Sequence, residues 1–224
     1  MTLPLCVVVG YGAGVGHGIA AAFARTGCPL LLCCRGPERH QSLIAQLEQL
    51  GSSVAVQAAD AAEPQALAAT LQAALPGQPT GPVVLVYNAV APTAALPTAL
   101  SPARLAADLQ VDVVGALAAV QAVLPLVRQR GGALLFTGGG MAYHPVAPLA
   151  SIGIGKAALR SLVQCLAQEL AAQSPAVGVG MVTIMGQVAV GTAFDPGAIG
   201  EAFVTLQQRL ARGEPGQTEV LFQG

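Results

Sequence analysis

The sequence predicts an α/β fold: a doubly wound, seven-stranded parallel sheet with helices on both faces, arranged in three layers. Apolar runs rich in β-branched residues alternate with longer Ala-, Leu- and Gln-rich stretches that have helical spacing. The apolar runs are nearly continuous, which is typical of parallel strands buried on both faces. The 224 residues include no Ser/Gly-rich linker and no block of charges. We therefore expect a single domain over residues 1–224.

The expected elements follow from these runs in chain order. The first run, Leu5-Cys6-Val7-Val8-Val9, is uninterrupted and ends at a glycine. Seven strands are expected in all, at Leu5–Gly10, Leu30–Cys34, Ser53–Gln57, Val83–Tyr87, Ala133–Thr137, Val177–Ile184 and Glu219–Phe222. The intervening helices are expected to start near Gly14, Glu38, Pro64, Ser101, Ala147 and Pro196. Right-handed crossovers between such strands give a doubly wound sheet.

The tail of the chain allows two interpretations. Residues Thr218 to Gly224 resemble the cleavage site of a viral 3C protease, as found in expression tags, and they also have the pattern of a last strand. We favour the strand, because the preceding helix needs a segment that returns the chain to the sheet.

A glycine-rich turn follows the first strand. It runs Gly10-Tyr11-Gly12-Ala13-Gly14-Val15-Gly16 and opens an Ala-rich helical stretch. Missing side chains let a ligand approach the backbone closely, and the unpaired N–H groups of a first helical turn face an anion. The turn therefore predicts a Rossmann-type site for a dinucleotide pyrophosphate, formed by Gly10, Gly12, Gly14, Val15 and Gly16. The alternative is an ordinary strand-to-helix turn.

Composition argues against several other classes. Charged residues make up only 9% of the chain, and the formal net charge is −1, which disfavours nucleic acid or an anionic membrane as a partner. The mean hydropathy is +0.63, but the uncharged stretches are too short to span a membrane or are interrupted by Gly, Pro and Gln, so no membrane span is expected. The start of the chain lacks the pattern of a secretion signal, and a cytoplasmic location is expected. So few charges leave little polar surface for a monomer, which favours a homo-oligomer.

The cysteines and histidines do not predict a metal site. Cys6, Cys28, Cys33, Cys34 and Cys165 have no C-x-x-C spacing and no histidine at ligand spacing. We expect five buried free thiols.

Several motifs in this order resemble the short-chain dehydrogenase/reductase family, over essentially the whole chain. Gly10, Gly14 and Gly16 match its glycine turn, and Asp60 matches an acidic residue after the third strand. Asn88-Ala89 matches its N-A-G motif, with Val90 in place of the last glycine, and Lys156 in Gly-Lys-Ala-Ala-Leu matches its lysine.

The resemblance implies an oxidoreductase that binds a nicotinamide cofactor. Asp60 would then lie beside the adenine, and Lys156 would donate to the hydroxyls of the nicotinamide ribose. Thr192 would reach the nicotinamide carboxamide from a substrate lid that is truncated in this chain. The helical stretches 101–130 and 147–173 would form a dimer or a tetramer.

The end of the second strand bears on the choice of cofactor. Cys34 occupies the position where an acidic residue would bind the ribose hydroxyls of NAD, and Arg35 follows it. A guanidinium can form paired, charge-assisted bonds to a 2′-phosphate, so NADP(H) is favoured over NAD(H). The alternative is a solvated arginine, in which case either cofactor could bind.

The catalytic positions depart from the family pattern. Ile152 stands four residues before Lys156, where a catalytic tyrosine is usual, and Gly139 or Gly138 replaces the serine. Asp112 replaces an asparagine. Lys156 can still bind the ribose, although a salt bridge to Asp112 is an alternative role.

A proton donor would have to come from elsewhere. Tyr143 and His144 are the nearest candidates, although both could simply form a pocket wall. Hydride transfer to an iminium carbon would need no donor.

The resulting hypothesis is an NADP(H)-dependent reductase of a small organic carbonyl or imine, with Lys156, Tyr143, His144 and Asp112 as candidate catalytic residues. The alternatives are a non-catalytic NADP(H)-binding sensor or scaffold and, less favoured, a non-redox lyase or isomerase.

Overall fold

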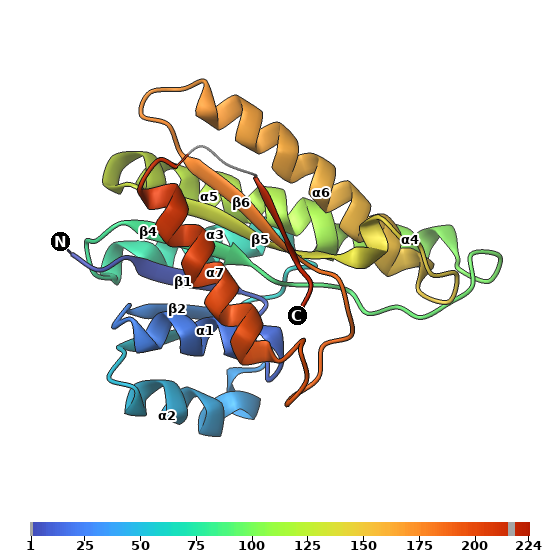
Figure 1. Cartoon of the computed structure of the whole chain (residues 1–224), viewed down its shortest axis with the longest axis horizontal. Coiled ribbons are helices and arrows are strands. Elements are labelled where there is room, and N and C mark those ends of the chain that lie inside the picture. The colour runs from blue at the N-terminus through green and yellow to red at the C-terminus, as the bar shows by residue number, and fades with distance from the viewer. Residues whose placement is uncertain (1, 215–217) are drawn as a thin grey trace.

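A single seven-stranded sheet organises the chain (Figure 1). The structure is a computed structural model that describes residues 2–214 and 218–224. All strand pairs are parallel, and the strand order is β3-β2-β1-β4-β5-β6-β7. The strands are β1 (Leu5–Val9), β2 (Leu30–Cys34), β3 (Val54–Ala58), β4 (Val83–Tyr87), β5 (Gly132–Gly139), β6 (Gly178–Ile184) and β7 (Glu219–Phe222). The predicted fold class is confirmed, and each predicted strand is present with bounds shifted by at most two residues.

The helices begin close to the predicted positions. They are α1 (Val15–Arg25), α2 (Gln41–Gln49), α3 (Pro64–Ala74), α4 (Pro102–Leu109), α5 (Gly115–Arg130), α6 (Ala150–Ala171) and α7 (Pro196–Ala211), with short 3₁₀ turns η1 (Pro37–His40), η2 (Leu75–Gly77) and η4 (Gly140–Ala142). The helix expected from Ser101 onward contains a π-helical turn, η3 (Gln110–Val114), between α4 and α5. A π turn carries one residue more than an α turn and is often found at functional sites.

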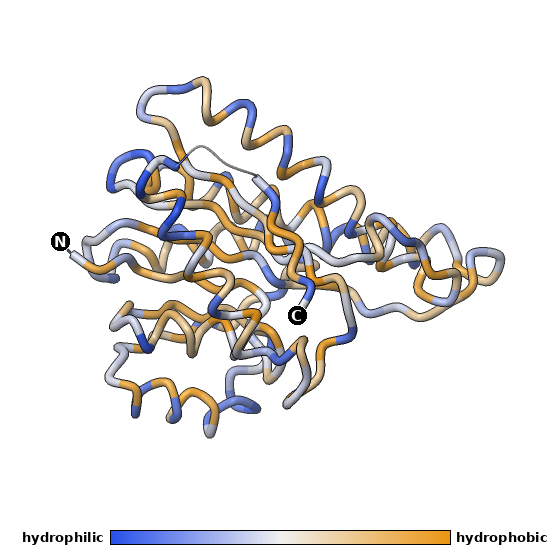
Figure 2. The backbone as a smooth tube through the Cα atoms, in the orientation of Figure 1, coloured by the Kyte–Doolittle hydropathy of each residue, from blue (hydrophilic) through white to orange (hydrophobic). Residues whose placement is uncertain are grey.

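Two apolar cores lie on opposite faces of the sheet. Leu5, Val7 and Val9 of β1 face the core that α3, α5 and α6 cover, whereas Cys6 and Val8 face the core covered by α1, α2 and α7. Figure 2 shows the corresponding pattern, with hydrophobic colour along the strands and mixed colour along the outer helix α6. The strand order reverses between β1 and β4, and the chain leaves these neighbouring strands towards opposite faces, to α1 on one and to α4 and α5 on the other. Open α/β sheets bind ligands in the crevice at such a point.

Helices α1 and α7 cross at small residues. A Cβ added to Gly18 would lie 2.0 Å from the carbonyl oxygen of Pro196, and one added to Gly200 would lie 2.2 Å from the carbonyl oxygen of Gly18. Neither position has space for a larger side chain, so the start of α7 packs directly on the first turns of α1.

The tail forms the seventh strand. Glu219 to Phe222 pair in parallel with Met181 to Ile184 of β6, as the strand interpretation of the tail predicted.

One cysteine differs from expectation. Cys6, Cys28, Cys33 and Cys34 are buried, but Cys165 is exposed, so the prediction that every thiol is buried is wrong for Cys165. The residues of α6 that face the core include Leu159, Val163 and Leu166, and position 165 falls outside that stripe.

Within the described residues, one helical stretch has the length and composition to cross a membrane. It covers Pro102–Arg130, and 44% of its most apolar window is buried. Ala119, Val120 and Val123 of this stretch pack into the core against the sheet. Since core helices satisfy the same criteria, the stretch is weak evidence for a membrane span.

Candidate functional site

The glycine turn leaves open space at the end of β1. Gly10 has a φ of +86°, and an added Cβ would lie 2.4 Å from the backbone nitrogen of Ala89, so only glycine fits there. An added Cβ at Gly12 or Gly14 would meet no atom within 4 Å. Helix α1 then begins at Val15, and no side chain caps it. The turn therefore presents an uncapped helix start to an empty space, which fits a pyrophosphate.

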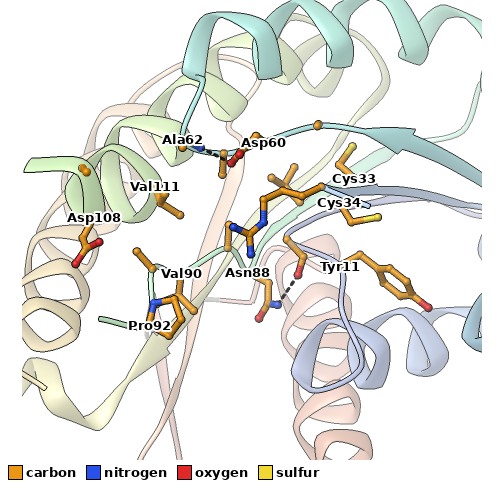
Figure 3. A pocket seen from close by; sticks show the side chains of 18 of the residues that line it. Tyr11, Cys33, Cys34, Asp60, Ala62, Asn88, Val90, Pro92, Asp108 and Val111 are labelled. Atoms are coloured by element: carbon orange, nitrogen blue, oxygen red, sulfur yellow. Dashed lines mark hydrogen bonds between the residues drawn. The ribbon is translucent and has the colours of Figure 1, made fainter. Parts of the chain in front are cut away.

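A pocket of about 390 Å³ lies beside this turn, at the ends of β1, β2 and β4. Its wall includes Cys34, Arg35 and Asp60, which were predicted to lie near the adenosine half of a cofactor, and Asn88 and Ala89, which were predicted as cofactor-binding residues. Figure 3 shows the Cys34, Asp60 and Asn88 side chains around this hollow. Asp60 accepts a hydrogen bond from the backbone N–H of Ala62 at 2.9 Å, which fixes its carboxylate at the end of β3.

A second cavity, of about 850 Å³, lies at the carboxyl ends of β5 and β6. Its lining is mostly apolar and includes Met141, Leu149, Ile152, Met185 and Val188. Lys156 and His144 are the titratable side chains that line it among the described residues. Such a cavity suits a small organic molecule with few charges.

A chain of hydrogen bonds connects the glycine turn to the lysine. Asn88 donates from Nδ2 to the carbonyl oxygen of Gly10 at 2.9 Å, and its Oδ1 accepts from the Thr137 hydroxyl at 2.9 Å. Lys156 donates from Nζ to the carbonyl oxygen of Thr137 at 2.7 Å. Both halves of the crevice are thus held by one polar network, in which each buried polar group has a partner.

Lys156 is buried, with 7% of its surface exposed. Burial disfavours the charged amine and lowers the pKa of Lys156 to about 8, while the negative charge of Asp112 opposes that shift. An amine with a pKa of about 8 titrates close to neutral pH, whereas an ordinary lysine, with a pKa of 10.5, stays protonated there.

Asp112 lies in the π turn η3, behind the lysine. Its Oδ1 accepts from the backbone N–H of Ala91 at 2.7 Å, whereas its Oδ2 is buried and has no hydrogen-bond partner among the described residues. Burial raises the pKa of Asp112 to about 6, against the opposing effects of the Ala91 hydrogen bond and the Lys156 charge. The described residues include no salt bridge between Asp112 and Lys156, and the ammonium donates to the carbonyl oxygen of Thr137. The alternative prediction, in which Lys156 forms a salt bridge to Asp112, is therefore wrong.

The sequence left open whether Gly138 or Gly139, at the end of β5, occupies the position of the usual serine, and the structure distinguishes the two. An added Cβ at Gly139 would lie 3.4 Å from Cγ of Lys156, so this position faces the lysine. An added Cβ at Gly138 would point to the opposite side and lie 2.3 Å from the Thr183 hydroxyl oxygen. Gly139 therefore occupies the place beside the lysine, and Ile152 provides an apolar wall of the same cavity.

Tyr143 lies outside this cavity, contrary to the sequence expectation. Its hydroxyl donates to Glu219 at 2.7 Å and accepts from Nε of Arg160 at 2.8 Å, and its ring lies 4.6 Å from the Arg160 guanidinium carbon. These contacts hold the phenol against Glu219 of β7 and Arg160 of α6, and Tyr143 is not part of the cavity wall that contains Lys156. His144, one residue further along, does line the cavity, at its exposed rim.

Thr192 is also absent from the cavity wall, although it was predicted to reach the cofactor. Its hydroxyl donates to the carbonyl oxygen of Ala189 at 2.8 Å and accepts from the backbone N–H of Phe194 at 3.1 Å. The hydroxyl is used to close a turn, and Met185 to Val188 supply the cavity wall from this segment.

Two residues of the site were missed. Thr137 holds the lysine through a backbone carbonyl, for which a sequence carries no signal. Gly155 lies against Asp112, since a Cβ added to Gly155 would be 2.0 Å from Oδ2 of Asp112. The position of Gly155 immediately before Lys156 was the sequence signal that could have indicated its role.

The comparisons with known proteins agree with this geometry. The model of the short chain dehydrogenase family matches residues 5–192, which is most of the chain. The chain therefore belongs to the short-chain dehydrogenase family. No curated protein matches the sequence.

Several solved structures share the fold. An alcohol dehydrogenase from the archaeon Thermococcus sibiricus, complexed with 5-hydroxy-NADP, is 23% identical, with 98% of this chain and 96% of that chain covered and a TM-score of 0.82. A metagenomic short-chain oxidoreductase in complex with NADP is 24% identical, with coverages of 97% and 96% and a TM-score of 0.83. An NADH-dependent reductase complexed with NAD is 17% identical, with coverages of 98% and 94% and a TM-score of 0.83. Structural relatives thus bind either nicotinamide cofactor.

Proposed function

We propose that this chain is an NADP(H)-dependent reductase of a small organic carbonyl or imine compound. The observation that carries the proposal is the continuity of the site. The open glycine-turn segment borders both a pocket containing Arg35 and Asp60 and an apolar cavity containing Lys156, and the two hollows share Asn88 in their walls. A nicotinamide cofactor bound there would supply the hydride.

The residues of the chain have distinct roles in this proposal. The N–H groups at the start of α1 bind the pyrophosphate, and Asp60 lies beside the adenine. Arg35 recognises a 2′-phosphate, while Cys34 contributes no carboxylate that would repel it. Lys156 binds the ribose of the nicotinamide, and the apolar walls orient the acceptor and exclude water. Orientation in a dry cavity can lower a barrier by about 7 kcal/mol or more.

Cofactor binding is tested by calorimetric titration with NADPH and NADH. Replacing Arg35 with Ala removes charge-assisted bonds of about 1.5–3 kcal/mol, which corresponds to a roughly 10- to 150-fold weaker Kd for NADPH. The Kd for NADH should stay within about twofold, since NADH has no 2′-phosphate. Arg128→Ala, at the far end of α5, is the matched control and should change neither constant. Equal losses for both cofactors in Arg35→Ala would contradict the NADP(H) assignment.

Turnover is tested with panels of ketones, aldehydes and imines, by following NADPH absorbance. The absence of hydroxyl groups at Gly139 and Ile152 favours a second candidate, a protein that binds NADP(H) without turning it over. Tight NADPH binding without reduction of any compound in the panels would favour that candidate.

We also propose a homodimer or homotetramer. Val114, Leu117 and Ile154, on helical stretches that were predicted to pair between subunits, are 43%, 36% and 44% exposed, so a partner chain packed there would bury apolar surface. Light scattering after size exclusion would give the mass in solution, and a monomer at micromolar concentration would refute this part of the proposal.

A further inference from the structure

Reduction of a carbonyl or a neutral imine requires a proton as well as a hydride, and the cavity offers two titratable side chains. His144 is exposed on the loop after η4. Lys156 is buried on α6 and is anchored at 2.7 Å to a carbonyl oxygen of β5. A group on a packed helix is held in place more firmly than one on an exposed loop. Resting on the function proposed above, we propose that Lys156 is itself the proton donor, giving a proton from Nζ to the oxygen or nitrogen of the acceptor, directly or through one water molecule.

The surroundings of Nζ leave it free to donate. An ammonium has three N–H donors, and the described residues accept one of them, at Thr137. The remaining donors are sufficient for a ribose hydroxyl and for the acceptor. Gly139, which faces the lysine stem, has no side chain that could intervene. Ile152 is shorter than a tyrosine and has no hydroxyl, so the acceptor can approach the lysine where a tyrosine would otherwise stand between them.

The charges around Lys156 suit this role. Asp112 faces it from η3, with Asp108 of α4 behind Asp112, and His144 lies across the cavity. Arg160 lies one turn further along α6 and is paired with Glu219 of β7 at 2.7 Å. The neighbouring parts of β5 and β6 contribute no titratable group. With its pKa lowered to about 8, Lys156 is protonated at neutral pH and is still acidic enough to donate.

The step balances without a further reactant. One N–H bond of the ammonium breaks, and one O–H or N–H bond forms on the acceptor, whose reacting carbon has received the hydride and its electron pair. Lys156 is left as a neutral amine and regains its proton from solvent after the product has left the cavity.

The titration of Lys156 can be measured without any turnover. The sequence has a single lysine, so an amine-reactive reagent followed by peptide mapping reports on Lys156 alone, apart from the α-amino group. The labelling rate of the folded protein should rise with a midpoint near pH 8. In Asp112→Asn the midpoint should move to lower pH, because the carboxylate charge that favours the ammonium is gone. A midpoint at the ordinary lysine value of 10.5, or one that Asp112→Asn leaves unchanged, would overturn the inference.

Turnover measurements then separate proton donation from binding. The substitution Lys156→Arg keeps a positive charge and N–H donors, but a guanidinium does not release a proton in proteins. Lys156→Arg should lower kcat for a ketone by about 100-fold or more, the usual contribution of a general acid. Because Lys156 also binds the ribose in the proposed function, Lys156→Arg is expected to raise the KM for NADPH, so kcat is compared at saturating NADPH. The ratio of ketone turnover to turnover of a permanently cationic N-alkyl iminium should then fall by about 100-fold, since the iminium needs no proton but shares every other loss. In the wild type, kcat for the ketone should fall above pH 8, and Asp112→Asn should move this fall to lower pH.

The outcomes distinguish the inference from the proposed function. Ketone reduction by Lys156→Arg within threefold of the wild type would overturn the inference alone. So would a loss of ketone reduction in His144→Ala that spares the iminium. An NADPH-binding wild type that reduces none of these acceptors would overturn the proposed function, and the inference with it.

Discussion

Replacing Gly155 with Ala tests how closely Asp112 is held against α6. The new Cβ would lie 2.0 Å from Oδ2 and 2.9 Å from Cγ of Asp112, so the carboxylate has to move and give up its bond to Ala91. Overpacking costs about 1–3 kcal/mol, and the lost charged hydrogen bond costs about 1.5–3 kcal/mol. The gain in helix propensity offsets about 1 kcal/mol. The free energy of unfolding should therefore fall by roughly 1.5–5 kcal/mol.

Gly153→Ala, two residues away on the same helix, is the matched control. Its Cβ would lie 3.5 Å from the carbonyl oxygen of Met141, an ordinary contact, so only the propensity gain of about 0.5–1 kcal/mol remains. The assay is thermal unfolding of both variants at equal protein concentration. The two variants should differ by about 2–6 kcal/mol, and since 1 kcal/mol shifts Tm by about 2–4 °C for a chain of this size, their melting temperatures should differ by roughly 4–24 °C. Equal melting temperatures would refute the close contact between Asp112 and α6.

Three other measurements probe the site and its surroundings. Gly139→Ser should have a Tm close to that of the wild type. Gly138→Ser should lose about 1–3 kcal/mol of its free energy of unfolding, because its Cβ would lie 2.3 Å from the Thr183 hydroxyl oxygen. Equal melting temperatures of the two variants would contradict this expectation. Burial alone would raise the pKa of Glu219, but hydrogen bonds from Thr183, Tyr143 and Arg160 hold this pKa below 4.5. The ionised carboxylate therefore stabilises the fold at pH 7, and this stabilisation is lost as the pH falls below 4.5. Glu219→Gln should thus melt below the wild type at pH 7, with a difference that shrinks in acid; a constant difference would rule out this role. In the native protein Cys165 should react fastest with a maleimide, because the other four thiols are buried. Burial raises the pKa of Cys33 to about 12, so rapid labelling of Cys33 would contradict the closed apolar core.

The features that sequence could predict were those with a local cause. An uninterrupted run such as Leu5 to Val9 has few alternatives to a buried strand, and the glycine turn follows it directly. The tail strand at Glu219 was harder to predict, because four residues with strand character also fit a protease site. The position of Arg35 followed from the end of β2, and the structure places it in the pocket at that end.

The features that sequence could not predict depend on partners distant in the chain. Tyr143 and His144 are neighbours, yet one bonds Glu219, 76 residues away, and the other lines the cavity. Propensity and spacing do not determine which of two adjacent loop side chains turns inward. Asp112 was predicted to act near the lysine, and its charge does influence the pKa of Lys156, but the π turn that carries it contacts both α4 and α6 and has no clear sequence pattern.

The crossing of α1 and α7 has a mechanical consequence for the crevice. Pro196 begins α7 directly after the segment that runs from the cavity wall at Met185, and it rests on Gly18, four residues beyond Gly14. Since no side chain stands between the two backbones at Gly18 and Gly200, Pro196 is held directly against the first turns of α1. The segment that carries the cavity-wall residues Met185 to Val188 therefore ends on the helix that the glycine turn opens, and the two ends of the crevice share one backbone contact.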